Sequence, residues 1–306
     1  MGVLKRKLKT VFTTKRSIMK WVARQKFFRL VPDKLALKIL YKNVFYKKLN
    51  LKNPQTFNEK LQWLKLYNRN PLYTTLVDKY AVKEYVANII GEEHIIPTLG
   101  VWEKFDDIDF DVLPDKFVLK CTHSSGDIVI CKDKNAFDKA AAKKKLENFL
   151  KKDIYKIGRE WPYKNVPRKI IAEKYMEDEI YHELRDYKFF CFDGVCKCFK
   201  VDFDRFIKHR ANYYDKEKKL LPFGEKAYLP DIEKKIELNQ NIDEMIGLSE
   251  KLAKNFSFLR VDFYNVNGKI YFGELTFYPT SGFGKFTDEN GDRLLGDWIT
   301  LPKKRK

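Results

Sequence analysis

A chain of 306 residues is long enough for two modest domains or one large one, and its 44% apolar and 15% aromatic residues exclude a largely disordered protein. The net charge is +19, and most of it lies at the two ends: residues 1–50 carry fifteen Lys or Arg against the single acid Asp33, and residues 302–306 add four positive charges. The stretch 51–301 is close to neutral.

Residues 1–50 combine basic and apolar side chains at roughly helical spacing, as in Ile18, Trp21 and Val22 and again over residues 35–40. Basic amphipathic helices suit an anionic membrane surface. A helix that packs on the main body and turns a basic face to solvent would show the same pattern. Both interpretations stay open at the level of sequence.

Two further helices are expected before residue 100. Residues 58–69 predict a helix with Asn53 or Thr56 near its start and Trp63 facing inward. Residues 77–90 predict a second helix, which ends at Gly91.

Short apolar runs separated by turn residues predict several strands in the rest of the chain. Asp193-Gly194 and Asn267-Gly268 are strong hairpin signals. The alternation of strand pairs and helices predicts an α+β protein with largely antiparallel sheets. The common nucleotide motifs GxGxxG and GxxxxGK[ST] are absent. The expected strands are 117–121, 127–131, 169–176, 187–192, 195–201, 258–264 and 269–275, and the expected helices are 136–151 and 231–254.

The cysteines and the lack of long apolar runs indicate the compartment. The chain has five cysteines, an odd number, and no CxxC pair, which favours a reducing compartment without disulfides or a zinc site. No apolar run approaches the roughly 20 residues needed to span a bilayer. No apolar signal core follows the basic N-terminus. We therefore expect a cytoplasmic protein.

Lys120 and the loop that follows it are the first candidates for chemistry. Lys120 interrupts an apolar strand and precedes a loop that contains Ser124, Ser125 and Gly126. A loop of small residues lets backbone N–H groups approach phosphate oxygens, and a lysine at its base supplies a fixed positive charge. Taken alone, Lys120 is better explained as a strand-edge lysine that points to solvent.

The last hairpin carries the second set of candidates. Arg260 and Asp262 alternate and so share a face of their strand. A two-residue Asn-Gly loop would put Glu274 on the opposite face. A three-residue loop that pairs Asn265 with Lys269 would instead place Glu274 opposite Arg260 and diagonal to Asp262. In that register two carboxylates and an arginine converge, as a magnesium–phosphate site requires. A surface ion pair is the alternative.

The third candidate is the end of the strand at 169–176, where Glu173, Tyr175 and Met176 follow one another closely. Nucleotide bases often bind at such a chain exit, although a strand that simply leaves the core is the commoner explanation. Among the four histidines, His123 alone lies in the small-residue loop.

Taken in order, these segments resemble the ATP-grasp superfamily, and most closely the TupA-like family associated with bacterial cell-surface polysaccharide synthesis. The similarity covers roughly residues 50–300. The segments that carry it are residues 58–63, 78–80, 117–126, 172–176, 186–189 and 260–281.

The resemblance implies nucleotide-binding roles for several residues. Lys79 and Lys120 correspond to the two phosphate-contacting lysines, and the loop of His123, Ser124, Ser125 and Gly126 to the one that closes over the phosphates. Glu173, Tyr175 and Met176 correspond to the adenine-binding hinge. Asp186 is the candidate for the ribose contact, and Lys188 is counted with the nucleotide-binding residues.

The resemblance also implies a magnesium site. Asp262 and Glu274 correspond to magnesium ligands, and Arg260 to the arginine that stabilises the acyl-phosphate stage. Thr276 stands where the family usually has Asn; its hydroxyl can still ligate magnesium or hold a water, but the second metal and full activity are put in doubt.

The implied fold is the ATP-grasp fold, in which two α+β subdomains with antiparallel sheets clasp ATP. The expected divisions are a basic N-terminal segment, a helical region, the small lid subdomain, the catalytic subdomain and a basic tail, at residues 1–50, 51–115, 116–185, 186–301 and 302–306.

The implied activity is ATP-dependent ligation of a carboxylate to an amine through an acylphosphate. We expect an amide between an amino acid and a uronic acid of a bacterial surface glycan, such as a capsule, O-antigen or teichuronic-type polymer, with residues 1–50 held at the inner face of the membrane. No nucleic acid is then expected as a partner. The alternatives are a nucleic-acid-binding protein with basic termini and a transferase-like glycan protein without ATP chemistry.

Overall fold

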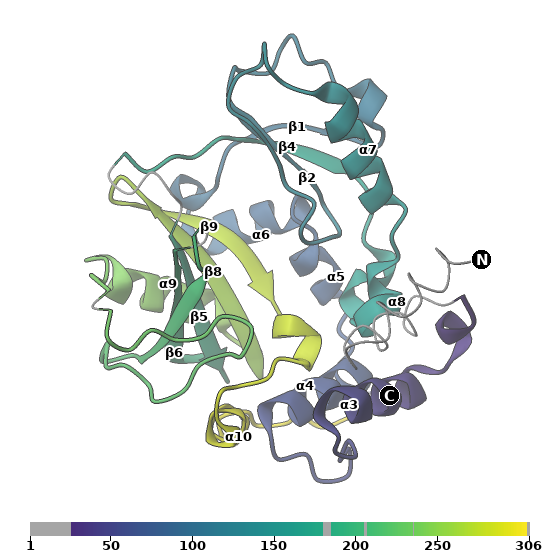
Figure 1. Cartoon of the computed structure of the whole chain (residues 1–306), viewed down its shortest axis with the longest axis vertical. Coiled ribbons are helices and arrows are strands. Elements are labelled where there is room, and N and C mark those ends of the chain that lie inside the picture. The colour runs from purple at the N-terminus through teal and green to yellow at the C-terminus, as the bar shows by residue number, and fades with distance from the viewer. Residues whose placement is uncertain (1–25, 180–184, 205–206, 235, 305–306) are drawn as a thin grey trace, which may run out of the picture.

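The computed structural model describes residues 26–179, 185–204, 207–234 and 236–304. Its strands form two antiparallel sheets, as the sequence predicted. Figure 1 shows the smaller sheet with helix α7 (Lys139–Leu150) at the top of the view and the larger sheet with helix α9 (Ile242–Ala253) below it. The other helices are α3 (Asp33–Phe45), α4 (Phe57–Tyr67), α5 (Leu72–Val77), α6 (Ala81–Ile90), α8 (Ile154–Gly158) and α10 (Glu289–Asp297).

The small sheet has the strand order β1-β4-β2-β3. Its apolar face packs against α7, because Phe117, Leu119 and Ile170 share one buried cluster with Leu146 of that helix. The sheet takes its first strand from residues before 116, so the small subdomain begins earlier than the expected boundary. The four strands are β1 (Thr98–Trp102), β2 (Phe117–Cys121), β3 (Val129–Cys131) and β4 (Ile170–Lys174).

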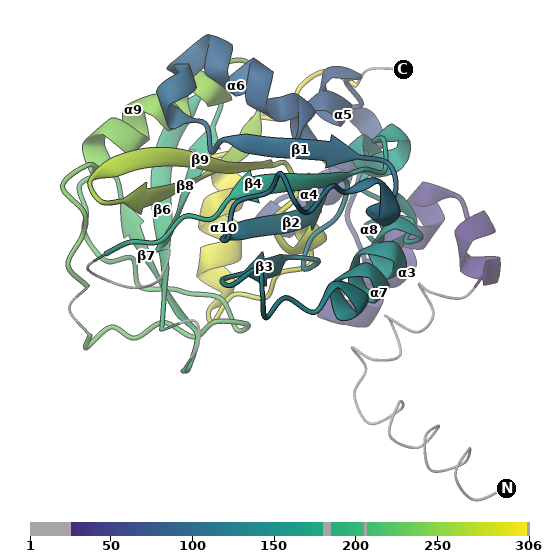
Figure 2. The same cartoon turned by 90° about the horizontal axis from the view of Figure 1, so that it is seen from above.

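The large sheet has the strand order β7-β6-β5-β8-β9. Helix α9 packs on β5, β6 and β8, and α6 lies beside α9 (Figure 2). The face of the sheet away from α9 carries charged side chains, which form the site described below. The five strands are β5 (Asp186–Phe192), β6 (Val195–Phe203), β7 (Arg210–Asp215), β8 (Phe258–Val266) and β9 (Lys269–Thr276).

Local sequence signals explain several element boundaries. Helix α4 starts after Thr56, whose side chain accepts the N–H of Glu59 while the Glu59 carboxylate accepts the N–H of Thr56. Both expected hairpins form two-residue turns with positive φ at each central residue: 47° and 83° at Asp193 and Gly194, and 50° and 81° at Asn267 and Gly268.

Three of the expected boundaries that were wrong have the same cause, a side chain that binds the backbone. The helix expected over 77–90 starts only at Ala81, since Asp78 accepts the N–H groups of Tyr80 and Ala81 in a turn. The strand expected over 127–131 starts at residue 129, since Asp127 turns back to bind the N–H of Cys121.

The helix expected over 231–254 is the third case and covers only Ile242–Ala253. The amide of Asn212 on β7 bonds the backbone of Asp231 in both directions, at 2.8 Å each. Asn239 accepts the N–H of Asn241 at 2.8 Å and so holds a turn directly before the helix.

Helix α3 decides part of the question about residues 1–50. One apolar face of it, with Ala36, Leu37, Leu40 and Tyr41, is buried, so this helix packs on the main body, whereas Leu35 is 51% exposed. Asp33 anchors its first turn through ion pairs with Arg69 at 2.6 Å and Arg159 at 3.1 Å. The apolar positions Ile18, Trp21 and Val22 lie outside the described residues.

The five cysteines are all buried and free. Among the helices of the described residues, none combines the length and the apolar character needed to cross a membrane.

Candidate functional site

A cavity of about 230 Å³ lies between the two sheets. We call it the inter-sheet cavity. Residues from segments that are far apart in the sequence line it, and both sheets contribute charged side chains to its wall. The lining residues used in the argument are Lys79, Lys83, Lys120, Ser125, Gly126, Glu173, Asp186, Lys188, Asp262, Gly273 and Glu274.

Asp262 and Glu274 are direct cross-strand neighbours on β8 and β9. The hairpin has the two-residue loop that would have separated them, but the register shifts between Asp262 and Phe263 because Gly273 is an extra residue on β9. The two-residue loop pairs Val266 with Lys269, as one of the two predicted registers had it, but beyond the bulge the pairing of Glu274 matches neither. The bulge restores the shared face, and it places Glu274 opposite Asp262 rather than diagonal to it.

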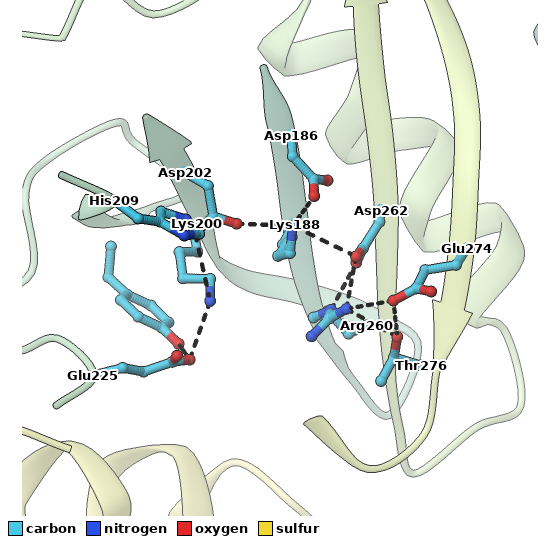
Figure 3. A network of polar contacts seen from close by, with 11 residues as sticks. Asp186, Lys188, Lys200, Asp202, His209, Glu225, Arg260, Asp262, Glu274 and Thr276 are labelled. Atoms are coloured by element: carbon cyan, nitrogen blue, oxygen red, sulfur yellow. Dashed lines mark hydrogen bonds and ion pairs between the residues drawn. The ribbon is translucent and has the colours of Figure 1, made fainter. Parts of the chain in front are cut away.

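Arg260 ties this cluster together, as Figure 3 shows. Its guanidinium donates to both oxygens of Asp262 at 2.7 and 2.6 Å and to Glu274 at 2.8 Å. It also donates to the hydroxyl of Thr276 at 3.0 Å. A planar guanidinium suits this bidentate geometry, which a lysine could not reproduce. The four side chains therefore form one connected unit, in which Arg260 and Asp262 are buried while Glu274 and Thr276 are partly exposed.

Lys188 extends the unit toward β6. Its ammonium forms ion pairs with Asp186, with Asp202 at 2.8 Å and with Asp262 at 3.8 Å. Burial alone would lower the pKa of Lys188, but the three carboxylates outweigh burial and raise it. Lys188 therefore stays charged, and it holds Asp186 at the edge of the inter-sheet cavity.

The charge of this face favours a cation. Four carboxylates (Asp186, Asp202, Asp262 and Glu274) face two basic groups (Lys188 and Arg260), which leaves two negative charges when all are ionised. Burial raises the pKa of Asp262 to about 6, although Arg260 and Lys188 act in the opposite direction. Asp262 is therefore ionised at neutral pH and protonated in mild acid.

The donor set fits magnesium that arrives with phosphates. Within the described residues, no three His, Cys, Asp or Glu side chains form a group that could hold a metal by themselves. Magnesium commonly uses only one or two protein carboxylates and takes its other ligands from phosphates and water. Asp262 and Glu274 provide such a pair, and the Thr276 hydroxyl lies 3.0 Å from Glu274.

The small sheet contributes an opposing group of charges. Glu173 forms ion pairs with Lys120 at 2.5 Å and with Lys83 at 2.7 Å. Burial opposes ionisation of Glu173, but the two lysines outweigh it and lower its pKa to about 2. Lys83 was missed from the sequence. The available signal was its position one helical turn after Lys79.

The small-residue loop lies beside Lys79. The backbone N–H of Lys79 donates to Thr122 at 3.0 Å, and its ammonium donates to the carbonyl of Ser124. Ser125 and Gly126 line the inter-sheet cavity, and Gly126 has φ of +83°, which glycine adopts without strain. The loop thus exposes two of its small residues to the cavity.

His123, Tyr175 and Met176 are placed differently. The His123 side chain is buried, burial lowers its pKa, and it is not among the residues that line the inter-sheet cavity. Tyr175 has its ring centroid 5.8 Å from the ammonium groups of both Lys116 and Lys132. Met176 lies on the segment that leaves β4, outside the cavity lining.

A second cavity of about 370 Å³ adjoins the first. We call it the second cavity. Lys79, Ser125, Gly273 and Glu274 line both, so these residues mark the junction between the two spaces. Glu160 also lines the second cavity, and no sequence pattern singled it out.

Comparison with known proteins gave a family match and several similar structures. A family model described as TupA-like ATP-grasp matches residues 59–300. D-alanine–D-alanine ligase from Bacillus anthracis, solved with ATP, is 18% identical at a TM-score of 0.41, over 74% of this chain and 65% of that one. The Helicobacter pylori D-alanine–D-alanine ligase is 14% identical at a TM-score of 0.38, over 80% and 69%.

D-cycloserine synthetase is 14% identical at a TM-score of 0.39, over 68% of this chain and 64% of that one. The chain spans less than two thirds of the B. anthracis ligases, at 57% and 65% of their length in two structures. No curated protein sequence matches the chain.

Proposed function

The chain belongs to the TupA-like ATP-grasp family, and from this premise we propose that it uses ATP to join a carboxylate to an amine. The family and the fold expected from the sequence are thereby confirmed. Membership of this family supports ATP-dependent chemistry; the ligase reaction and the substrates below are our proposal.

ATP binds in the inter-sheet cavity under this proposal. Lys79 and Lys120 approach from the small-sheet side to contact the phosphates, and the loop with Ser125 and Gly126 covers them. Glu173 orients Lys120 through their ion pair. Other nucleotide contacts remain predictions of the family resemblance. They are the adenine hinge at Glu173, Tyr175 and Met176, the ribose contact of Asp186, and nucleotide binding by Lys188 and His123.

Asp262 and Glu274 would hold magnesium, and the Thr276 hydroxyl could offer a third oxygen. When bound, the ion neutralises part of the phosphate charge and draws electrons from the transferring phosphoryl group. The net negative charge of the cluster favours such a cation. The ion pairs between Arg260 and the two acids keep both carboxylates in place.

The reaction proceeds in two displacements. A substrate carboxylate oxygen attacks the γ-phosphorus, the bond to the β-phosphate oxygen breaks, and an acylphosphate and ADP form. An amine then attacks the acyl carbon, the carbon–oxygen bond to phosphate breaks, and an amide and inorganic phosphate result. Arg260 lines the second cavity, beside Glu274 at the junction, and stabilises the charge that develops on the transferred group.

We assign the substrates by class. The carboxylate is a uronic acid of a bacterial cell-surface polysaccharide or of its precursor, and the amine donor is an amino acid. The reaction takes place in the cytoplasm near the anionic inner face of the membrane. The family and the +14 charge of residues 1–50 support this placement.

One observation carries the proposal: the bulge at Gly273 brings Asp262, Glu274 and Arg260 to one face beside a cavity with Lys79 and Lys120 on its other side. The test is phosphate release from Mg-ATP across a panel of uronic acids and amino acids. We expect release that depends on both substrates and that falls at least about 100-fold in Asp262→Asn and Glu274→Gln. Release that these substitutions leave unchanged would contradict the proposal.

A further inference from the structure

The second cavity lies beyond the expected end of the nucleotide. Arg260 and Glu274 line it together with Lys79 at the junction. If ATP fills the inter-sheet cavity, its terminal phosphate lies at this junction. The carboxylate and the amine must then meet the phosphate from the second cavity.

The charged groups of the second cavity are few. Among the described residues that line it, Lys79 and Arg260 are cationic, and Glu160 and Glu274 are anionic. Arg260 and Glu274 form an ion pair at 2.8 Å, and the ammonium of Lys79 donates to the carbonyl of Ser124. Of the two acids in this cavity, Glu274 belongs to the proposed magnesium site, and Glu160 does not.

Glu160 lines the second cavity and lies near a buried cation. The ammonium of Lys65 is fully buried and donates to the carbonyls of Gly158 and Ser281 at 2.7 and 2.8 Å, and to the Ser281 hydroxyl at 3.1 Å. Oε1 of Glu160 and the Ser281 hydroxyl are neighbours, since a Cβ atom at Gly158 would lie 2.9 Å from the first and 2.1 Å from the second. Glu160 is also near enough to Lys65 for their charges to interact.

The backbone at Ser281, which contacts Lys65, has an unusual conformation. Thr280, Ser281 and Gly282 all have left-handed backbone conformations, with φ of 50°, 55° and 59°. Two successive non-glycine residues in this conformation are costly and persist only where the surroundings enforce them. The contacts of Lys65 with the carbonyl and hydroxyl of Ser281 supply that enforcement. Such strain is common at binding sites.

We propose that Glu160 binds the ammonium group of the amine substrate and takes its proton before the amine attacks. This inference rests on the proposed ligase function and names the donor as a primary amine that arrives as a cation. The proton passes from the ammonium nitrogen to a Glu160 oxygen, which frees the nitrogen lone pair for the acyl carbon. The second proton of the nitrogen leaves with phosphate, and Glu160 returns its own to solvent after product release.

The electrostatic environment agrees with this role. Burial raises the pKa of Glu160, while Lys65 and the Ser281 hydroxyl hold it down. A carboxylate with a raised pKa is a better proton acceptor than one in water, provided that it is still ionised when the amine arrives. Burial likewise lowers the pKa of Lys65 to about 7, against the influence of Glu160 and Asp33.

The competing explanation is that Glu160 only neutralises the buried charge of Lys65. Hydroxylamine separates the two, because it is uncharged at neutral pH and attacks an acylphosphate without prior loss of a proton. The wild-type enzyme with Mg-ATP and glucuronate or galacturonate should form a hydroxamate with hydroxylamine and an amide with an amino acid. Glu160→Gln should lower kcat/KM for the amino acid about 100-fold or more and leave hydroxamate formation within about threefold.

A pH profile adds a second readout. The deficit of Glu160→Gln should shrink as the pH rises toward the pKa of the amine, since the free base then needs no acceptor. The double variant Lys65→Met/Glu160→Gln has no buried charge left to neutralise. It should stay defective with amino acids, whereas a purely neutralising role predicts recovery.

Equal loss of hydroxamate and amide in Glu160→Gln, no loss of either, or recovery in the double variant would each overturn the role of Glu160. The absence of hydroxamate in the wild type with every carboxylate tested would instead overturn the ligase proposal itself. Because the two failures differ in the wild-type result, they are distinguishable.

Discussion

Glu274 lies directly opposite Asp262 because Gly273 is an extra residue on β9. A Cβ atom at position 273 would lie 3.1 Å from the carbonyl oxygen of Asp262 and 3.1 Å from the ring of Tyr264. Gly273→Ala should therefore cost about 1–3 kcal/mol in the free energy of unfolding and weaken Mg-ATP binding. Chemical denaturation and titration calorimetry measure the two effects.

Gly247→Ala is the matched control, since no atom lies within 4 Å of a Cβ at that position in α9. It should leave Mg-ATP binding intact and stabilise the protein by about 0.5–1 kcal/mol, because alanine is the better helix former. Equal behaviour of the two variants would show that the bulge does not position Glu274.

This bulge also shows what the sequence could not predict. The turns at Asp193-Gly194 and Asn267-Gly268 are local features and were predicted correctly. The register beyond them was not, because an extra residue on each hairpin, Lys197 on β6 and Gly273 on β9, shifts the pairing. Bulges depend on packing across the whole sheet, so no local pattern announces them.

The residues of the candidate site likewise fall into those that local sequence could predict and those that it could not. Lys79, Lys120 and Glu173 could be selected because each stands in a recognisable local segment, and the structure places all three at one cavity. Glu160 and Lys65 could not, since their relationship passes through a turn more than a hundred residues away in the sequence. Long-range contacts of this kind are set by the completed fold.

Arg260→Lys tests whether the cluster requires a guanidinium. Arg260 bonds three side chains at once, and an ammonium is a compact charge that cannot reproduce the planar fork. We expect phosphate release to fall by about 10–100-fold while the fold is retained. Arg260→Met should in addition lose about 3–5 kcal/mol of stability, because the buried charge of Asp262 is then left with one fewer partner. Full activity of Arg260→Lys would contradict the assigned role.

Glu173→Gln should change stability in a defined pH range. The pKa of Glu173 is about 2 in the folded protein, below the 4.5 of an ordinary glutamate, because Lys120 and Lys83 outweigh burial. A lowered folded-state pKa stabilises the protein above the unfolded-state value, and this contribution is lost as the pH falls from 4.5 toward 2. At neutral pH we expect a loss of about 3 kcal/mol, which should disappear near the lower end of that range.

Urea denaturation of wild type and Glu173→Gln at a series of pH values measures this effect. Glu177→Gln is the control, since the ion pair of Glu177 with Lys116 is exposed and 3.4 Å long. A pH-independent difference between wild type and Glu173→Gln would show that the ion pairs do not hold the Glu173 pKa down.

Mg-ATP binding should weaken as the pH falls below about 6, where Asp262 takes up a proton. Its folded-state pKa is raised above the unfolded value of 3.8, so ionisation of Asp262 costs stability as the pH rises through this window. A bound cation requires the ionised form and therefore favours it. Titration calorimetry should show this pH dependence in the wild type and its loss in Asp262→Asn. The same profile in both would assign the titration to another group.

The exposed face of α3 offers a test of membrane contact that leaves the fold intact. Removing residues 1–50 would also remove Leu37 and Leu40 from the core, so substitution is the better design. Lys34, Lys38 and Lys42 recur every four residues and are exposed. Each basic residue near an anionic surface contributes about 1 kcal/mol, so replacing all three with Gln should weaken binding to phosphatidylserine vesicles by about 100-fold.

Replacing the exposed Lys144, Lys251 and Lys254 with Gln removes the same charge from helix α7 and from the end of α9. If α3 faces the membrane, this control should bind vesicles nearly as well as the wild type, and added salt should weaken both, because exposed charges are screened. Equal losses in the two triple variants would mean that only net charge matters. Tighter binding of the wild type to RNA than to vesicles would favour nucleic acid as the partner of the basic ends.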